Sequence, residues 1–76
     1  EGPMVVCRNE DKPLIIGRVA TIIGEAGVNI ANLVLGRDER GGRAATILNV
    51  DDALSDEVME KIRAVPHVKE ARLVQL

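Results

Sequence analysis

The chain has 76 residues, a formal net charge of −2 at pH 7 and no Phe, Tyr or Trp. That length allows one domain with a small aliphatic core, which leaves the fold only marginally stable by itself. Charges of both signs are spread along the chain, so we expect neither a nucleic-acid nor a membrane partner. No apolar run approaches the roughly 20 residues that cross a bilayer, and the single cysteine fits a reducing compartment. We therefore expect a cytoplasmic protein.

The chain begins with a strand that leads into a helix. Residues 4–7 are a short apolar run rich in β-branched residues, which predicts a buried strand, and the polar residues 9–12 are expected to end it as a loop. Pro13 suits the first helical position because its missing N–H needs no partner there. The next apolar residues recur at helical spacing: Ile15, Val19, Ile22, Ile23 and Ala26. Gly27 is predicted to end this helix in a left-handed conformation.

Two strands joined by a tight turn follow. Residues 28–37 are predicted to be the second strand, but their apolar alternation changes phase near Ala31 and Asn32. Either both faces of that strand are covered, or a β-bulge resets its register. Residues 38–42 end in two glycines and predict a hairpin turn. In the third strand, residues 43–51, one face is expected to carry Ala44, Thr46, Leu48 and Val50, and the other Ala45 and Ile47.

A second helix and a fourth strand complete the pattern. Ser55 is predicted to be the helix N-cap, Pro66 prevents continuation, and residues 68–76 form the last strand. This order predicts an α+β, ferredoxin-like βαββαβ sandwich, with a four-stranded, mostly antiparallel sheet and two helices on one face. The uncovered face is expected to be partly apolar, which predicts a partner. Its expected members are Val5, Cys7, Ala45, Ile47, Ala71 and Leu73, or their neighbours in the opposite phase.

The side chains do not suggest catalysis or metal binding. His67 is the only histidine and lies in a short turn, where a solvated residue is the simpler interpretation. Cys7 lies in a strand with no neighbouring histidine and is interpreted as an inert, partly buried thiol. RNA-binding modules of this topology stack bases on exposed aromatic residues, and this chain has none. We predict no catalytic residue, no metal ligand and no cofactor in this domain.

The loop before the first helix is where the sequence predicts a ligand site. A helix N-terminus offers free backbone N–H groups that attract a carboxylate. Asp11 can hold an ammonium group, and Asn9 and Asn29 can donate and accept hydrogen bonds. Together these groups suit an amino acid zwitterion. A structural role fits the same residues equally well, with Asp11 as a helix cap and Asn29 as a turn residue.

Residues 9–17 and 27–32 resemble an ACT domain, and the resemblance is strongest to the C-terminal regulatory domain of bacterial D-3-phosphoglycerate dehydrogenase. Gly36 and Arg37 before the hairpin, Val65 and Pro66, and residues 71–74 fit the same pattern. The resemblance covers residues 4–76. The ACT domain of iron–sulfur L-serine dehydratase is similar to much the same degree. The resemblance implies a non-catalytic regulatory domain of a serine-metabolism enzyme, with NAD bound only elsewhere in the parent enzyme.

The resemblance also implies a homodimer whose two sheets join side by side, with an amino acid effector, expected to be serine, at the interface. Leu14 and Ile15 are expected to offer backbone N–H groups, and Asn29 to reach across from the second copy. The complete set of expected effector contacts is Asn9, Asp11, Pro13, Leu14, Ile15, Asn29 and Ile30.

One departure from the family pattern bears on this site. The family usually has glycine directly after the proline, where this chain has Leu14. Glycine allows close approach of a ligand to the backbone, and leucine is expected to fill that space. This favours a first rival, a dimerisation module without a ligand. A second rival, a domain that completes an enzyme's active site, is opposed by the lack of a His or Cys constellation. The start at Glu1-Gly2-Pro3, ahead of Met4, predicts a fragment or residues left by cloning.

Overall fold

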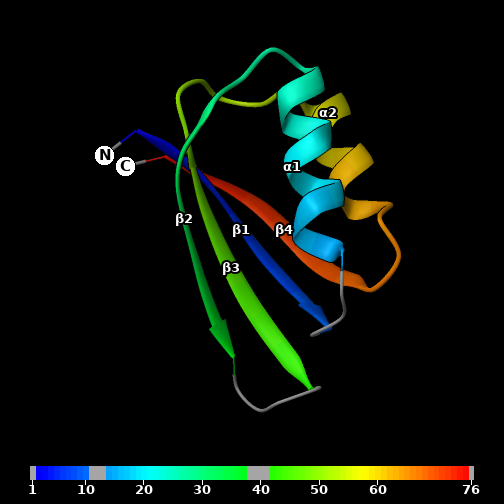
Figure 1. The fold of residues 1–76 in the computed structure, drawn as a ribbon. Coiled ribbons are helices and arrows are strands. Elements are labelled where there is room, and N and C mark those ends of the chain that lie inside the picture. Colours follow the sequence, from blue (N-terminus) through cyan, green and yellow to red (C-terminus); the bar gives the residue numbers. More distant parts are fainter. Residues whose placement is uncertain (1, 11–13, 38–41, 76) are drawn as a thin grey trace.

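A computed structural model describes residues 2–10, 14–37 and 42–75 of the chain, and it has the predicted βαββαβ order (Figure 1). Both helices lie on one face of the sheet. The elements are β1 (Pro3–Glu10), α1 (Ile15–Glu25), β2 (Ile30–Arg37), β3 (Arg43–Val50), α2 (Asp56–Arg63) and β4 (Val68–Gln75). The predicted α+β fold class is therefore confirmed.

The strands are ordered β2-β3-β1-β4, and all three pairings between them are antiparallel. β1 and β2 run in the same direction, but β3 lies between them. The helical crossover through α1 thus joins strands that are parallel without being neighbours. β2 and β4 form the two edges of the sheet, and this placement decides which backbone groups remain available for pairing.

β1 is longer than the sequence predicted, because Asn9 and Glu10 belong to the strand and not to the following loop. Asn9 pairs with Ala44 on β3 and with Val68 on β4. Asparagine has a low intrinsic preference for strands. A central strand satisfies its backbone groups on both sides, and this tertiary pairing outweighs the local preference.

The change of phase in β2 is a β-bulge, one of the two predicted alternatives. The register shifts between Ile30 and Asn32, so Ala31 is the additional residue. After the bulge, Leu33 lies opposite Leu48, and Ile30 before it lies opposite Val50. Because paired residues share a face, the bulge returns the apolar residues of β2 to the helix-facing side.

The core lies between the sheet and the two helices. Its buried cluster is Val5, Cys7, Val19, Ile23, Leu48, Val50, Leu54, Met59, Ile62 and Ala71. For β1 and β4 this corrects the first-named members of the uncovered face. Val5 and Cys7 pair with Leu48 and Thr46, which face the helices. The uncovered face instead carries their phase partners, so that Met4, Val6 and Val74 join Ala45 and Ile47.

The start of α2 and the end of α1 follow the predicted residues, whereas α1 begins at Ile15, with Leu14 as its N-cap, and not at Pro13 as predicted. The Ser55 hydroxyl accepts a hydrogen bond from the backbone N–H of Val58 at 3.2 Å, which confirms the N-cap of α2. Gly27 follows α1 with a φ of +82°, as predicted for a left-handed end. Ala26, which was expected on the buried face of α1, is exposed because α1 ends at Glu25.

Candidate functional site

Asn9 is a buried polar side chain near the end of β1, on the side of the sheet that faces the helices. It is 4% exposed. Its Nδ2 donates a hydrogen bond to the backbone oxygen of Glu10 at 2.9 Å, while its Oδ1 has no hydrogen-bond partner among the described residues. A buried acceptor without a partner is costly. Asn9 therefore offers an acceptor to a donor from outside the described chain.

α1 begins at the end of the sheet where β1 finishes, and it begins in an unusual way. Leu14, the residue before α1, has a φ of +72° and a ψ of −3°, the left-handed conformation that glycine adopts most easily. Holding a leucine there costs roughly 1–2 kcal/mol. No described side chain caps the first turn of α1. Among the described residues, therefore, no side chain competes with a carboxylate for the N–H groups of that turn, which start near Ile15.

The Leu14 side chain and Asn9 line different hollows of the surface. Leu14 is 73% exposed and lines an open hollow of about 490 Å³ together with α1 residues and Val65. Asn9 lines a second hollow of about 630 Å³ at the ends of β1, β3 and β4. Leucine therefore keeps the glycine-like backbone at this position while its side chain occupies a different part of the surface.

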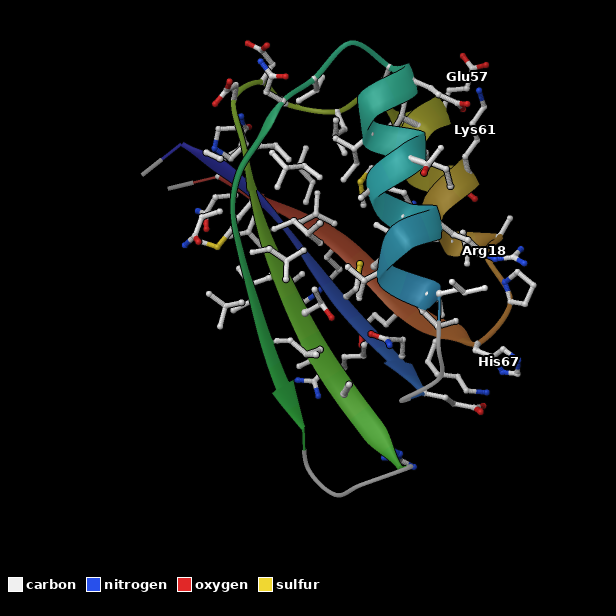
Figure 2. The ribbon with its side chains drawn as sticks, viewed as in Figure 1. Arg18, Glu57, Lys61 and His67 are labelled. Atoms are coloured by element: carbon white, nitrogen blue, oxygen red, sulfur yellow. The ribbon has the colours of Figure 1, made fainter. Side chains whose placement is uncertain are left out.

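The second hollow is edged by charged residues that tie the end of β1 to β4. The Glu10 carboxylate lies 3.0 Å from Lys69 Nζ and 3.3 Å from His67 Nδ1. The Glu10 backbone N–H also donates to the His67 oxygen at 3.0 Å. Figure 2 shows His67 in the turn before β4, at the end of the sheet where β1 finishes. The exposed ion pairs contribute little energy, but with the backbone bond they fix the residue next to Asn9.

Asn29 and Ile30 lie at the opposite end of the sheet. The Asn29 oxygen accepts a hydrogen bond from the N–H of Asp51 at 3.0 Å, and Ile30 pairs with Val50. Met4 on β1 pairs with Asn49, so the position of Val50 corresponds to Pro3, six residues before Asn9. At 3.3–3.4 Å per residue the separation along the strand is about 20 Å. One chain therefore does not bring Asn29 to Asn9. Asp11 and Pro13 lie outside the described residues.

The two residues considered for catalysis occupy structural positions. Cys7 is 1% exposed, and burial raises the pKa of its thiol to about 11, so it carries no thiolate at neutral pH. His67 is half exposed in its turn and pairs with Glu10. Within the described ranges no group of three or more His, Cys, Asp or Glu side chains is placed to hold a metal ion. None of the described helices is long and apolar enough to span a membrane.

The edge strand β2 exposes apolar side chains. Leu33, Val34 and Leu35 are 40%, 51% and 46% exposed. β2 also lies at the edge of the sheet, where backbone N–H and C=O groups are open to another strand. Sequence reasoning did not single out this edge. The signal in the sequence was the run of three consecutive apolar residues. Such a run is typical of a strand that is covered by other protein on both faces.

Comparison with known proteins gives consistent results. The ACT domain family model matches residues 4–67. The chain is 38% identical over 76 residues to the D-3-phosphoglycerate dehydrogenase of Methanocaldococcus jannaschii, and 35% identical over 75 residues to that of Bacillus subtilis. These alignments cover 100% and 99% of this chain but only 14% of each relative. The chain therefore spans a small part of the length of these relatives.

Two solved structures are similar in fold. The ACT domain from the GTP pyrophosphokinase of Chlorobium tepidum superposes with a TM-score of 0.73 at 21% identity, covering 95% of both chains. The C-terminal domain of the MgtC protein from Mycobacterium tuberculosis gives a TM-score of 0.73 at 8% identity, covering 97% of this chain and 85% of the other. At these identities the likeness concerns the fold alone, and it matches the βαββαβ arrangement described above.

Proposed function

Because the chain belongs to the ACT domain family, a regulatory type of domain, we propose that it binds a small amino acid, foremost serine, between two copies of itself. The observation that carries the proposal is Asn9, a 4% exposed amide whose Oδ1 has no partner among the described residues. A ligand ammonium or hydroxyl group can donate a hydrogen bond to this oxygen. The domain itself acts by binding and has no catalytic role.

The start of α1 supports binding of the ligand carboxylate. Its first turn has no described side-chain cap, and the positive end of the helix dipole favours an anion. Leu14 holds the left-handed backbone conformation that places these N–H groups, and its side chain lines a different hollow from Asn9. We therefore include Leu14 and Ile15 as backbone contacts. Asp11 and Pro13 stay in the proposed set on the family resemblance.

The topology supports a shared site. β1 and β2 run in the same direction, so the last residues of β2 lie at the Asn9 end of the sheet. If β2 pairs antiparallel with β2 of a second copy, the start of the second β2 arrives at that same end. Asn29 and Ile30 precede or begin that strand. Pairing through β2 thus brings Asn29 of the second copy toward Asn9, which one chain does not achieve.

We further propose that the parent protein is a D-3-phosphoglycerate dehydrogenase, since relatives of that name match essentially the whole chain. NAD then belongs to the catalytic part of the parent enzyme, and the enzyme acts in the cytoplasm. Serine bound between two copies favours one arrangement of the pair, and the attached catalytic domains respond through this linkage. The alternative parent protein is an L-serine dehydratase, with this chain as its ACT domain.

A second candidate function is dimerisation without a ligand. It is favoured by the exposed apolar residues of β2. Burial of Leu33, Val34 and Leu35 stabilises the pairing of two β2 edges whether or not an amino acid is present. The two candidates differ in one respect only. The regulatory domain binds an amino acid at the dimer interface, and the dimerisation module does not.

Calorimetric titration of the dimer with serine, glycine and alanine tests the proposal. We expect serine to bind, and Asn29→Ala to abolish binding while the dimer persists. Asn49→Ala is the matched control, since it removes an amide from the uncovered face of β3 and is expected to bind normally. If none of the amino acids gives a heat of binding, the proposal fails and dimerisation without a ligand is the function. Unchanged affinity in Asn29→Ala contradicts the contact across the interface.

A further inference from the structure

Thr46 is a second buried polar residue without a partner. It lies on β3, is 0% exposed, and its Oγ1 has no hydrogen-bond partner among the described residues. Asn9 Oδ1 is the other such buried side-chain atom in the part of the chain that the structure describes. Nothing in the sequence pattern or in the family resemblance singled out Thr46.

The two orphaned atoms belong to neighbouring positions on the same side of the sheet. Thr46 lies opposite Cys7. Asn9 lies opposite Ala44, two residues further along the same pair of strands and on the same face. Such diagonal neighbours are about 7–8 Å apart at the backbone, and their side chains approach more closely. A single water molecule that makes two hydrogen bonds of about 2.8 Å joins oxygens that are roughly 4.5–5 Å apart. The register therefore makes the two side chains diagonal neighbours on the helix-facing side, an arrangement in which one water can join their polar atoms.

The chemistry of the pair fits such a bridge. A valine has nearly the shape of a threonine and buries no hydroxyl, so an unpartnered threonine at this position is unfavourable by comparison. Asn9 Oδ1 is an acceptor with two lone pairs, and the Thr46 hydroxyl both donates and accepts. One water can accept from the hydroxyl and donate to Asn9 Oδ1, and the second lone pair of Oδ1 stays available for a ligand.

We propose that Asn9 Oδ1 and Thr46 Oγ1 together hold one buried water molecule, and that through this water Thr46 is a positioning residue for Asn9. The proposal rests on the proposed function in taking Asn9 as an effector contact. The water fixes the amide before the ligand arrives, while Nδ2 donates to the Glu10 oxygen. Pre-organising the amide lowers the cost of ordering it on binding.

Thr46→Val removes the hydroxyl and keeps the side-chain shape. We expect calorimetry to show serine affinity reduced about 5- to 10-fold, the amount that one lost hydrogen bond accounts for. Thr46→Ser keeps the hydroxyl and is expected to bind within about twofold of the unmodified chain. Thr21→Val is the matched control, because it removes an exposed α1 hydroxyl that donates to the Gly17 oxygen, away from Asn9. Equal serine affinity in Thr46→Val and the unmodified chain overturns the positioning role.

A second readout does not require any effector. Nuclear Overhauser contacts between water and the Asn9 side-chain amide protons are expected in the unmodified chain and in Thr46→Ser, and are expected to disappear in Thr46→Val. Absence of these contacts in the unmodified chain overturns the bridge. If no amino acid binds the unmodified chain, the proposed function fails, and the water contacts still decide whether Thr46 and Asn9 share a water molecule.

Discussion

The two edges of the sheet differ in chemistry. β2 exposes Leu33, Val34 and Leu35, whereas the exposed residues of β4 include Lys69, Glu70 and Arg72. Glu70 pairs with both Arg8 and Arg72 across this charged edge. Charged side chains discourage another strand from adding to an edge, and exposed apolar ones favour it. The β4 edge is therefore protected against the addition of another strand and the β2 edge is open to it, so we expect two copies to associate through β2.

The largest effect is expected just inside the open edge. Leu48 on β3 is 0% exposed and lies opposite Leu33, which is 40% exposed. Leu48→Ala is expected to lower the free energy of unfolding by roughly 3–4 kcal/mol because it leaves a cavity, and Leu33→Ala by less than about 1 kcal/mol. Urea denaturation of the dilute chain measures both. Equal losses in the two variants contradict the description of β2 as an open edge.

Matched substitutions at the two edges give the next largest effect. Val34 on β2 and Val74 on β4 both lie on the uncovered face of the sheet. Val34→Lys is expected to raise the dissociation constant of the dimer roughly 100-fold, because two lysines approach each other across a twofold interface and apolar burial is lost. Val74→Lys is expected to leave it unchanged. Sedimentation velocity separates these outcomes, and dissociation by Val74→Lys alone would move the interface to β4.

A pH effect tests the centre of the sheet, between the two edges. Burial raises the pKa of Cys7 from 9.0 to about 11. Between these values the unfolded thiol loses its proton and the folded one keeps it, so stability is present below pH 9 and falls as the pH rises toward 11. The expected loss is about 2–3 kcal/mol. Denaturation across this range should show a shallower decline in Cys7→Ala, and identical declines would contradict the buried, protonated thiol.

The smallest effects are expected at the two helix starts. Ser55→Ala removes the N-cap of α2 and is expected to cost about 1 kcal/mol. Leu14→Gly relieves the left-handed leucine before α1, and after the entropy cost of glycine it is expected to add roughly 0.5–1 kcal/mol. Thermal denaturation measures both changes. A loss of stability in Leu14→Gly would show that the leucine side chain makes contacts that outweigh its backbone strain.

Much of the fold could be predicted because its signals are local. The helical spacing, the Ser55 cap, the Gly27 end and the phase change in β2 each depend on a few adjacent residues. The length of β1, and which of its residues face the helices, could not be predicted from local signals. Both are decided by pairing with β3 and β4. Which strand becomes an edge is also set by pairing, so the three apolar residues of β2 did not reveal their exposure.

The candidate site was predictable in a different way. Family resemblance, and not periodicity, supplied the set of effector contacts. The structure places Asn9 and the start of α1 near one end of the sheet and Asn29 with Ile30 at the other, so proximity within one chain does not test the set. Thr46 could not be predicted as a site residue, because threonine is common on strands. Only its burial without a described hydrogen-bond partner distinguishes it.

The central claim is that Asn9 of one copy and Asn29 of a second copy contact the same ligand. It is tested most directly by mixing Asn9→Ala with Asn29→Ala and titrating serine. Each variant alone is expected not to bind. A mixed dimer has one intact site and one doubly altered site, so random mixing restores about a quarter of the sites. Recovery of that fraction at the affinity of the unmodified chain supports the claim. Absence of any recovery, when mixed dimers are shown to form, contradicts it.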